Sequence, residues 1–216
     1  MDEERFWYED GLDAEELEFQ RRYGPWKRST PTDALAMLRG YGGEWWLAGG
    51  WALEAFTGVR RPHGDVDLSL WRRDIEMLRL HLKDRYHLWS QDSGQLRPLT
   101  DEAPEQPATS EQIWLRKHAL APWEFDVIIN PERNGRWVFR RDRELDFALA
   151  DITWLAPDGV RYLNPELVLA YKAKAARAKD EHDLRTTLPF LSDQQRTWLA
   201  KMVEHLHPGH PWLERL

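Results

Sequence analysis

The sequence contains no cysteine, and this absence excludes several kinds of site. Without thiols, the chain cannot form a disulfide framework, bind zinc through thiolates or use a cysteine nucleophile. Its chemistry must come from other side chains, and the 216 residues include 37 Asp and Glu, 30 Lys and Arg and 8 His.

Long apolar runs are also missing. The most apolar stretch, WWLAGGWALEAF at residues 45–56, is interrupted by Glu54 and is shorter than the roughly 20 residues that a membrane-spanning helix needs. The first 20 residues are acidic and lack the basic and apolar regions of a secretory signal. These features predict a soluble, cytoplasmic protein that does not enter a membrane.

An excess of positive charge is the third absence. The net charge is −7 and the isoelectric point is near 5.6, whereas proteins that hold nucleic acid through its phosphates usually carry a basic face. Nucleic acid is therefore not the expected partner, although a basic face within an acidic chain would leave that alternative open. Arg and Lys cluster locally at 60–61, 72–73, 133–143 and 172–179, and such clusters suit a small phosphate ligand.

The pattern of apolar residues predicts an α/β (α+β) fold, with a small mixed sheet flanked by helices and a helical C-terminal region. Strands are expected at 45–48, 65–71 and 123–130, two strands within 87–100, and edge strands at 136–141 and 151–156. Helices are expected after Thr30-Pro31, at 51–56 and 72–86, and from residue 164 to the end, where 165–184 reads as one helix. We expect an extension at 1–28, a core domain at 29–160 and the helical region at 161–216.

Two acids, Asp65 and Asp67, flank one valine in the predicted strand 65–71. Alternate residues of a strand point to the same face, so their carboxylates would repel each other. A divalent cation reconciles them, and Mg²⁺ is typically held by one or two carboxylates together with substrate phosphates. The predicted strand 123–130 offers a third acid, Asp126, and Glu124 on the same face is the alternative.

Gly49 and Gly50 separate a predicted strand from a predicted helix. The absence of side chains lets backbone N–H groups approach a phosphate, and the N-terminus of the helix adds partial positive charge. Strand, Gly-Gly, helix, Asp-x-Asp and a later Asp form an order of elements that favours phosphoryl transfer from a nucleotide.

These motifs resemble a known family. The run GGWALEAFTGVRRPHGDVDL carries Gly-Gly-Trp, Arg-x-His and Asp-x-Asp, as in the aminoglycoside and lincosamide branch of the nucleotidyltransferase superfamily. LNPELVLAYKAKAARAKDEHDL and the closing HPGHPWL are similar to the aminoglycoside 2″-adenylyltransferase-like group. The resemblance spans roughly residues 33–216. Many superfamily members have Gly-Ser where this chain has Gly49-Gly50.

The resemblance implies roles for particular residues. Asp65 and Asp67 would be catalytic metal ligands for Mg²⁺, expected as two ions, and Asp126 would be the third ligand or the general base. The implied nucleotide-binding residues are Gly49, Gly50, Arg61, His63, Lys172, Lys174 and Lys179. Whether Lys172 or Lys174 neutralises the phosphates stays open, and these lysines equally suit a solvated helix face with a Lys179–Asp183 pair.

The implied activity is transfer of a nucleoside monophosphate, expected as AMP from ATP, to a hydroxyl of a small molecule such as an aminoglycoside, with release of pyrophosphate. A toxin-type enzyme that modifies tRNA or protein is the alternative, and a non-catalytic nucleotide-binding relative is a third. The sequence leaves the acceptor, the base of the nucleotide and the oligomeric state open.

Overall fold

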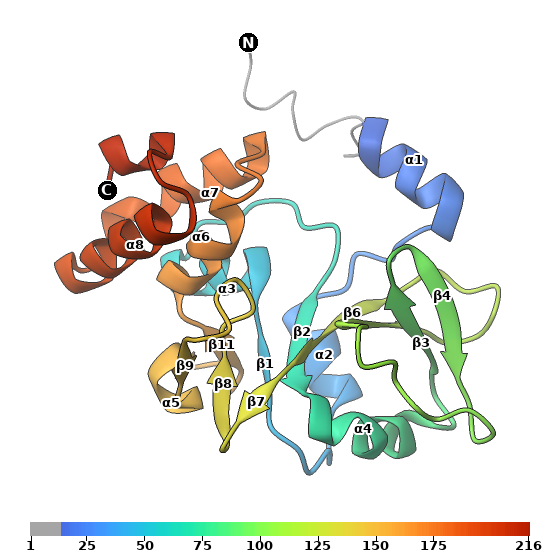
Figure 1. Cartoon of the computed structure of the whole chain (residues 1–216). Helices are drawn as coiled ribbons and strands as arrows, with labels where there is room; N and C mark the ends of the chain where they lie inside the picture. The colour runs from blue at the N-terminus through green and yellow to red at the C-terminus, as the bar shows by residue number, and fades with distance from the viewer. Residues whose placement is uncertain (1–13) are drawn as a thin grey trace.

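The structure, a computed structural model, describes residues 14–216, so residues 1–13 of the predicted extension lie outside the described residues (Figure 1). No helix within 14–216 combines the length and the apolar character that are needed to cross a membrane.

An eight-stranded mixed sheet forms the centre of the fold, as predicted. Its spatial order is β10-β11-β1-β2-β6-β5-β3-β4. The parallel pairs are β1 with β11 and β2 with β6, and the other neighbouring pairs are antiparallel. The strands are β1 (Trp45–Leu47), β2 (Asp67–Trp71), β3 (His87–Asp92), β4 (Gln95–Leu99), β5 (Gln112–Arg116), β6 (Phe125–Asn130), β10 (Thr153–Leu155) and β11 (Arg161–Leu163).

A three-stranded sheet and eight α-helices complete the described chain. The small sheet consists of β7 (Glu132–Arg133), β8 (Arg136–Val138) and β9 (Asp146–Phe147), so the segment predicted as an edge of the main sheet at 136–141 belongs to a separate sheet. The helices are α1 (Ala14–Tyr23), α2 (Pro31–Met37), α3 (Gly49–Thr57), α4 (Ile75–Leu82), α5 (Leu149–Ile152), α6 (Pro165–Ala173), α7 (Ala178–Thr187) and α8 (Asp193–Leu206). Figure 1 shows α6, α7 and α8 gathered at one side of the molecule.

Capping residues explain where several helices begin. Thr30 caps α2: its hydroxyl accepts from the Asp33 backbone N–H, and the Asp33 carboxylate accepts from the Thr30 backbone N–H. Ser192 and Gln195 make the same reciprocal pair at the start of α8. The helix start predicted at Thr30-Pro31 is confirmed.

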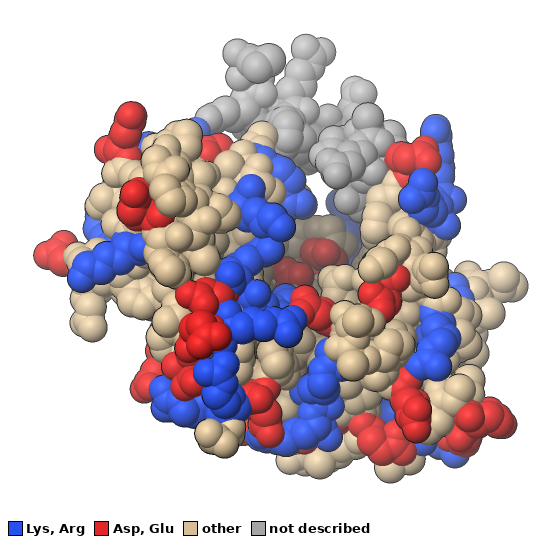
Figure 2. All heavy atoms as spheres, viewed as in Figure 1, with Lys and Arg blue, Asp and Glu red and all other residues tan. Residues whose placement is uncertain are grey.

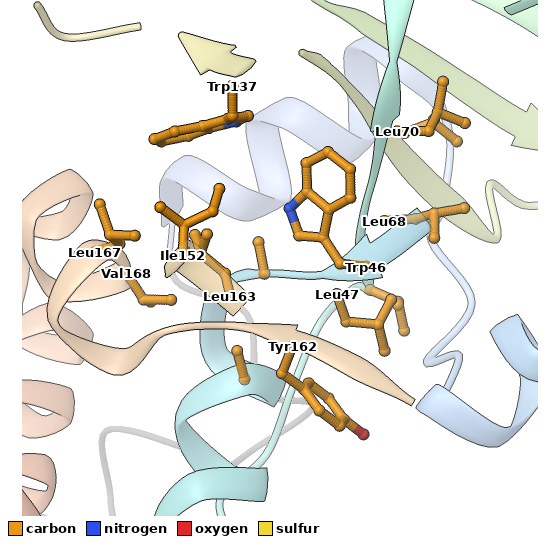
Figure 3. Packing of buried hydrophobic residues seen from close by; sticks show 14 of the residues in the cluster. Trp46, Leu47, Leu68, Leu70, Trp137, Ile152, Tyr162, Leu163, Leu167 and Val168 are labelled. Atoms are coloured by element: carbon orange, nitrogen blue, oxygen red, sulfur yellow. The ribbon is translucent and has the colours of Figure 1, made fainter. Parts of the chain in front are cut away.

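The apolar core joins the main sheet to the helical region. Trp46, Leu163 and Trp137 are almost completely buried, and Leu167 and Val168 of α6 belong to the same cluster. Figure 3 shows these side chains together, with residues from β1, β8, β11 and α6 in one group. Burial of one large aliphatic side chain stabilises the fold by about 1.5–3 kcal/mol.

The described part of the N-terminal extension packs on the sheet. The rings of Phe19 and Tyr23 lie 5.6 and 5.4 Å from the ring of Trp114 on β5. Trp26 forms a parallel bridge with Trp123, whose indole N–H donates to the Tyr23 carbonyl. These contacts hold α1 beside β3 and β4 (Figure 1).

Two predicted elements differ in the structure. The strand predicted at 65–71 begins only at Asp67, so Asp65 precedes it. The helix predicted over 165–184 is interrupted between Ala173 and Ala178, where Ala176 has φ of +42°. The new helix begins after Arg177, whose backbone N–H donates to the Asp180 carboxylate at 3.1 Å, as in a capping box.

The domain division near residue 160 stays a prediction. β11 begins at Arg161 and pairs with β1, so the sheet extends past that residue, and α6 and α7, which follow β11, pack against α3.

An ion-pair network ties α7 and α6 to the loop that follows α3. The Arg61 guanidinium donates to both carboxylate oxygens of Asp183, from Nε at 2.7 Å and from Nη2 at 3.0 Å. Lys172 Nζ lies 2.9 Å from Asp180 Oδ1 and 2.9 Å from Asp183 Oδ2. Asp180 and Asp183 are buried, and the side chains of Arg61 and Lys172 are each 11% exposed. The network crosses 122 residues of sequence between Arg61 and Asp183.

Replacing Asp183 by Ala should leave two largely buried cations without their shared carboxylate. Removal of one partner from a buried ionic group costs about 3–5 kcal/mol. We expect a loss of that size in urea unfolding of Asp183→Ala. The exposed Asp84 gives a matched control, and Asp84→Ala should stay within about 0.5 kcal/mol of the unmodified chain. Equal stability of the two variants would contradict this role of the network.

Candidate active site

The structure brings Asp67 and Asp126 together on neighbouring parallel strands. Asp67 is the first residue of β2, Asp126 is the second of β6, and the two are paired in register. Residues paired across adjacent strands, which lie about 4.8 Å apart, point to the same face. Asp126 is buried, and Asp67 is partly buried. Two carboxylates therefore share one poorly solvated place.

Burial and mutual repulsion disfavour the charged forms of these carboxyl groups. Burial, followed by the charge of Asp65, raises the pKa of Asp67 to about 6. Burial, followed by the charges of Asp67 and Asp65, raises the pKa of Asp126 well above its usual range. Asp126 Oδ2 accepts from Gln112 Nε2 at 2.6 Å, whereas its buried Oδ1 has no hydrogen-bond partner among residues 14–216. A buried carboxyl oxygen without a partner is unusual, and it can accept a bond from a ligand or a cation.

Asp65 lies at the edge of this pair rather than within it. It is exposed, it precedes β2, and its backbone carbonyl accepts from Trp51 Nε1 at 3.0 Å. The alternation expected for a strand from residue 65 therefore does not apply. Its charge still acts on both Asp67 and Asp126. Over 14–216, no three His, Asp or Glu side chains already stand in a metal-binding arrangement.

Glu124, the alternative third carboxylate, is engaged elsewhere. Its Oε2 accepts from Lys27 Nζ at 3.3 Å and from the Tyr86 hydroxyl at 3.1 Å. It precedes β6, and its side chain is only 5% exposed. Glu124 thus holds the segment that follows α1, whereas Asp126 lies beside Asp67.

Gly49 and Gly50 allow the start of α3 to approach these side chains. Gly49 has φ of +60°, and a Cβ at this position would lie 1.7 Å from Asp67 Oδ2. A Cβ at Gly50 would lie 2.0 Å from Arg61 Nη2 and 2.8 Å from His63 Nδ1. No side chain of the described residues caps α3 at Ala48, so the N–H groups of its first turn remain for a ligand.

Arg61 and His63 lie next to Gly50 and bind other side chains. His63 Nε2 is 2.8 Å from Glu54 Oε2, and Arg61 Nη1 is 3.1 Å from His63 Nδ1. Because Arg61 can only donate, Nδ1 accepts and the proton of a neutral imidazole lies on Nε2, facing Glu54. Burial, followed by the charge of Arg61, lowers the pKa of His63. The ring also stacks on Trp51 at 4.0 Å. Both residues thus pack against Gly50 in the first turn of α3.

The three predicted lysines occupy different places. Lys172 is paired with Asp180 and Asp183, and it lines a cavity beside Asp67. Lys174 is exposed, follows the end of α6 and lines the same cavity. Lys179, on α7, acts on Asp67 through its charge but does not line that cavity. The predicted Lys179–Asp183 pairing gives way to the contacts of Asp183 with Arg61 and Lys172.

The cavity beside Asp67, called the larger cavity below, has a volume of about 430 Å³ and a wall of basic and aromatic side chains. Figure 2 shows a hollow with acidic atoms inside and Lys and Arg gathered beside it. Its lining includes Gly49, Asp67, Gln112, Trp46, Trp137, Tyr171, Arg140, Arg141, Lys172, Lys174 and Arg177. Three of the cations, Arg140, Arg141 and Arg177, were not among the predicted site residues. The basic clusters at 133–143 and 172–179 were the signal that could have found them.

A smaller cavity of about 240 Å³ adjoins the larger one. Gln112 and Arg140 line both, so the two cavities meet at these residues, and Gln112 in turn donates to Asp126. The smaller cavity is otherwise lined by Gln91, Asp92, Ser93, Thr109 and Glu111. It is more acidic than the larger cavity.

The tight approach of Gly49 to Asp67 gives a first prediction for this site. Gly49→Ala adds both the strain of a positive φ and a clash with Asp67, whereas Gly58→Ala adds only the strain, because nothing lies within 4 Å of a Cβ there. We expect about 1 kcal/mol of destabilisation for Gly58→Ala and a further 1–3 kcal/mol, roughly, for Gly49→Ala. Paired urea unfolding curves measure the difference, and coincident curves would contradict the clash.

The raised pKa of Asp67 predicts that replacing this residue by Asn stabilises the fold, by an amount that depends on pH. The native state holds this proton more tightly than the unfolded chain, so the free energy of unfolding falls as the pH rises from about 4 through about 6. At pH 7, Asp67→Asn should therefore be more stable than the unmodified chain by up to about 3 kcal/mol. At pH 4 the two should be nearly equal. Unfolding is measured in chelator at both pH values, and a pH-independent difference would contradict the assignment.

The chain is similar to known proteins in one segment of its sequence and in its fold. A family described as aminoglycoside-2″-adenylyltransferase matches residues 32–105, a segment that contains Gly49, Gly50, Asp65 and Asp67. No curated protein matches the chain in sequence.

Two solved structures are similar in fold. The crystal structure of ANT(2″)-Ia in complex with adenylyl-2″-tobramycin has 15% sequence identity and a TM-score of 0.51, over 79% of this chain and 93% of that one. The solution structure of ANT(2″)-Ia has 16% identity and a TM-score of 0.49, over 83% and 95% of the two chains. At 15% identity, the crystal structure shows a shared fold. The matched segment is similar to the aminoglycoside-2″-adenylyltransferase family, and it and the shared fold support the resemblance that the motifs indicated.

Proposed function

We propose that this enzyme transfers a nucleoside monophosphate, expected as AMP from ATP, to a hydroxyl of an amine-bearing small molecule of the aminoglycoside class, with release of pyrophosphate. The observation that carries the proposal is the pair Asp67–Asp126, with its unpartnered buried oxygen, beside the glycine start of α3 and the basic cavity. The aminoglycoside class comes from the matched family and from the tobramycin adduct of the similar structure.

The larger cavity suits the nucleotide. Lys174, Arg141 and Arg177 offer charge to a triphosphate, and the Trp46, Trp137 and Tyr171 rings provide apolar wall for a base or ribose. The backbone N–H groups of the first turn of α3, including those of Gly49 and Gly50, add donors at the edge of that cavity. Lys172 contributes its charge while it remains paired with Asp180 and Asp183. Arg61 and His63 hold the start of α3 in place, and Lys179 adds positive charge near Asp67.

The residues present fit a divalent cation. Carboxylate oxygens are ligands that Mg²⁺ prefers, and a buried Asp126 Oδ1 without a partner has room for a metal bond. Asp67 and Asp126 would hold the metal, with Asp65 completing the set. When bound, Mg²⁺ neutralises the carboxylate and phosphate charges and acts as a Lewis acid on the phosphoryl oxygens.

The acceptor hydroxyl would enter from the smaller cavity, which meets the larger one at Gln112, the side chain that donates to Asp126. Asp126 takes the hydroxyl proton, the hydroxyl oxygen forms a bond to the α-phosphorus, and the bond to the bridging oxygen of pyrophosphate breaks. Asp92 accepts hydrogen bonds from the uncharged hydroxyls of Ser93 and Thr109, which leaves its negative charge for an ammonium group of the acceptor.

The two lobes divide this work in our proposal. The core domain, 29–160, supplies the acids, the glycines and the acceptor cavity, and the helical region, 161–216, supplies Lys172, Lys174 and Arg177 to the nucleotide cavity.

Pyrophosphate release tests the proposal. The purified chain, with Mg²⁺, one of four labelled nucleoside triphosphates and a panel of aminoglycosides, should release pyrophosphate and transfer label to an acceptor. Asp126→Asn and Asp67→Asn should each lose roughly 10³-fold or more in kcat, since a metal ligand is worth several kcal/mol of transition-state stabilisation. Chelator should also abolish turnover.

The control is Asp84→Asn, an exposed acid that lines neither of the two cavities in the described chain. It should turn over like the unmodified enzyme, and all variants should melt cooperatively. Turnover that survives in Asp126→Asn would remove this carboxylate from the mechanism. Label that enters total tRNA and no aminoglycoside would overturn the acceptor class while keeping the chemistry.

A further inference from the structure

Arg140 stands where the two cavities meet. It follows β8, and it lines both the 430 Å³ and the 240 Å³ cavity. The other residue shared by the two linings is Gln112, whose amide already donates to Asp126. Arg140 is thus the cation placed at the border between the nucleotide cavity and the acceptor cavity.

The side chain of Arg140 contacts Glu111 and Tyr171, and its Nε–H remains available as a hydrogen-bond donor. Its Nη1 donates to Glu111 Oε2 at 2.9 Å, its side chain is 20% exposed, and its guanidinium lies 5.9 Å from the centre of the Tyr171 ring. Its Nε is buried and has no hydrogen-bond partner among residues 14–216. A buried guanidinium N–H without an acceptor is costly unless a ligand supplies one.

The charge of Arg140 also reaches the reacting groups. It opposes the effect of burial on Asp126, whose pKa it lowers. In the proposed transfer the α-phosphate lies near Asp126, the proposed base, and the two cavities meet at Arg140 and at Gln112, which donates to Asp126. A planar guanidinium matches phosphate oxygens with two parallel donors, and a lysine cannot reproduce that fork.

We propose that Arg140 is a further substrate-contacting residue, which binds the phosphate oxygens of the nucleotide at the junction of the two cavities. Glu111 is its positioning residue, because it accepts from Nη1 and so fixes one edge of the guanidinium. This inference rests on the proposed function and deepens it.

The chain contains a matched control. Arg143 donates from Nη2 to the other oxygen of Glu111, at 3.3 Å, but its side chain is 72% exposed and it lines neither cavity in the described chain. Arg140→Gln and Arg143→Gln therefore remove the same charge and a bond to the same carboxylate, and they differ in access to the site.

Steady-state kinetics with nucleotide and an accepted aminoglycoside test the proposal. Arg140→Gln should lower kcat/KM for the nucleotide about 100-fold or more, the usual loss for a donor to developing transition-state charge, and Arg143→Gln should stay within twofold. Arg140→Lys keeps the charge but loses the fork, and it should fall between the two. KM for the acceptor should change little in all three.

A second measurement does not depend on turnover. Tripolyphosphate binding, followed by tryptophan fluorescence, should weaken in Arg140→Gln and not in Arg143→Gln. If the unmodified enzyme turned over no acceptor but bound tripolyphosphate through Arg140, the proposed function would fail and the phosphate role would stand. If it turned over normally and Arg140→Gln matched Arg143→Gln in both measurements, Arg140 would have no such role.

The role of Glu111 is separated by a double substitution. If Glu111 acts by positioning Arg140, then Glu111→Gln with Arg140→Gln should be no worse than Arg140→Gln alone, because the two residues act as one unit. Multiplied losses would show that Glu111 acts independently, for example on the acceptor. Should Arg140→Gln melt at a much lower temperature, two rescue tests are used: the Arg140→Lys variant, and addition of free guanidinium to Arg140→Gln. Partial recovery of activity in either test supports the phosphate role. A variant that is folded but recovers no activity contradicts it.

Discussion

The electrostatic conflict between Asp67 and Asp126 is the constraint on which the rest of the site depends. Parallel strands β2 and β6 place the two carboxylates in register, in a place where neither is well solvated. Burial and repulsion raise the pKa values of both groups, and one oxygen of Asp126 has no partner in the described chain. A fold that serves stability alone would replace such a pair with apolar residues. In our proposal a cation and a phosphate make the pair favourable, which ties its cost in the free protein to the proposed chemistry.

The surrounding structure keeps that pair accessible. Gly49 gives Asp67 its room, and Gly50 gives room to the Arg61–His63 pair. Arg61 in turn binds Asp183, and Asp183 shares Lys172 with Asp180, so the helical region is fastened to the loop beside α3. The same lysine lines the larger cavity. One network therefore both fastens the helical region to the loop beside α3 and brings charge to that cavity.

Local pattern was enough to predict much of the fold and part of the site. The Thr30–Asp33 cap, the helix after Gly49 and the strands that carry Asp67 and Asp126 follow from capping chemistry and apolar periodicity, which act over a few residues. The side-by-side placement of Asp67 and Asp126 needed only that their strands be neighbours. Their catalytic and metal-binding roles remain proposals.

Three features of the structure that the local sequence pattern could not predict depend on contacts between residues far apart in the chain. The start of β2 at Asp67 leaves Asp65 outside the strand, although the alternation of the sequence continues through it. The break before α7 arises from Asp180, which prefers to cap a new helix and to pair with Lys172. Arg140 follows a three-residue strand of a separate sheet, and its place between two cavities depends on Glu111 and Tyr171. Charge clusters in the sequence mark such residues only as a group.

The central claim is that Asp67 and Asp126 share a divalent cation delivered with a nucleotide, and anomalous diffraction tests it most directly. Crystals soaked with Mn²⁺ and a non-hydrolysable nucleoside triphosphate analogue should show an anomalous peak in contact with both carboxylates, including the Oδ1 of Asp126 that lacks a partner here. Bound nucleotide with no peak between these two side chains would contradict the account.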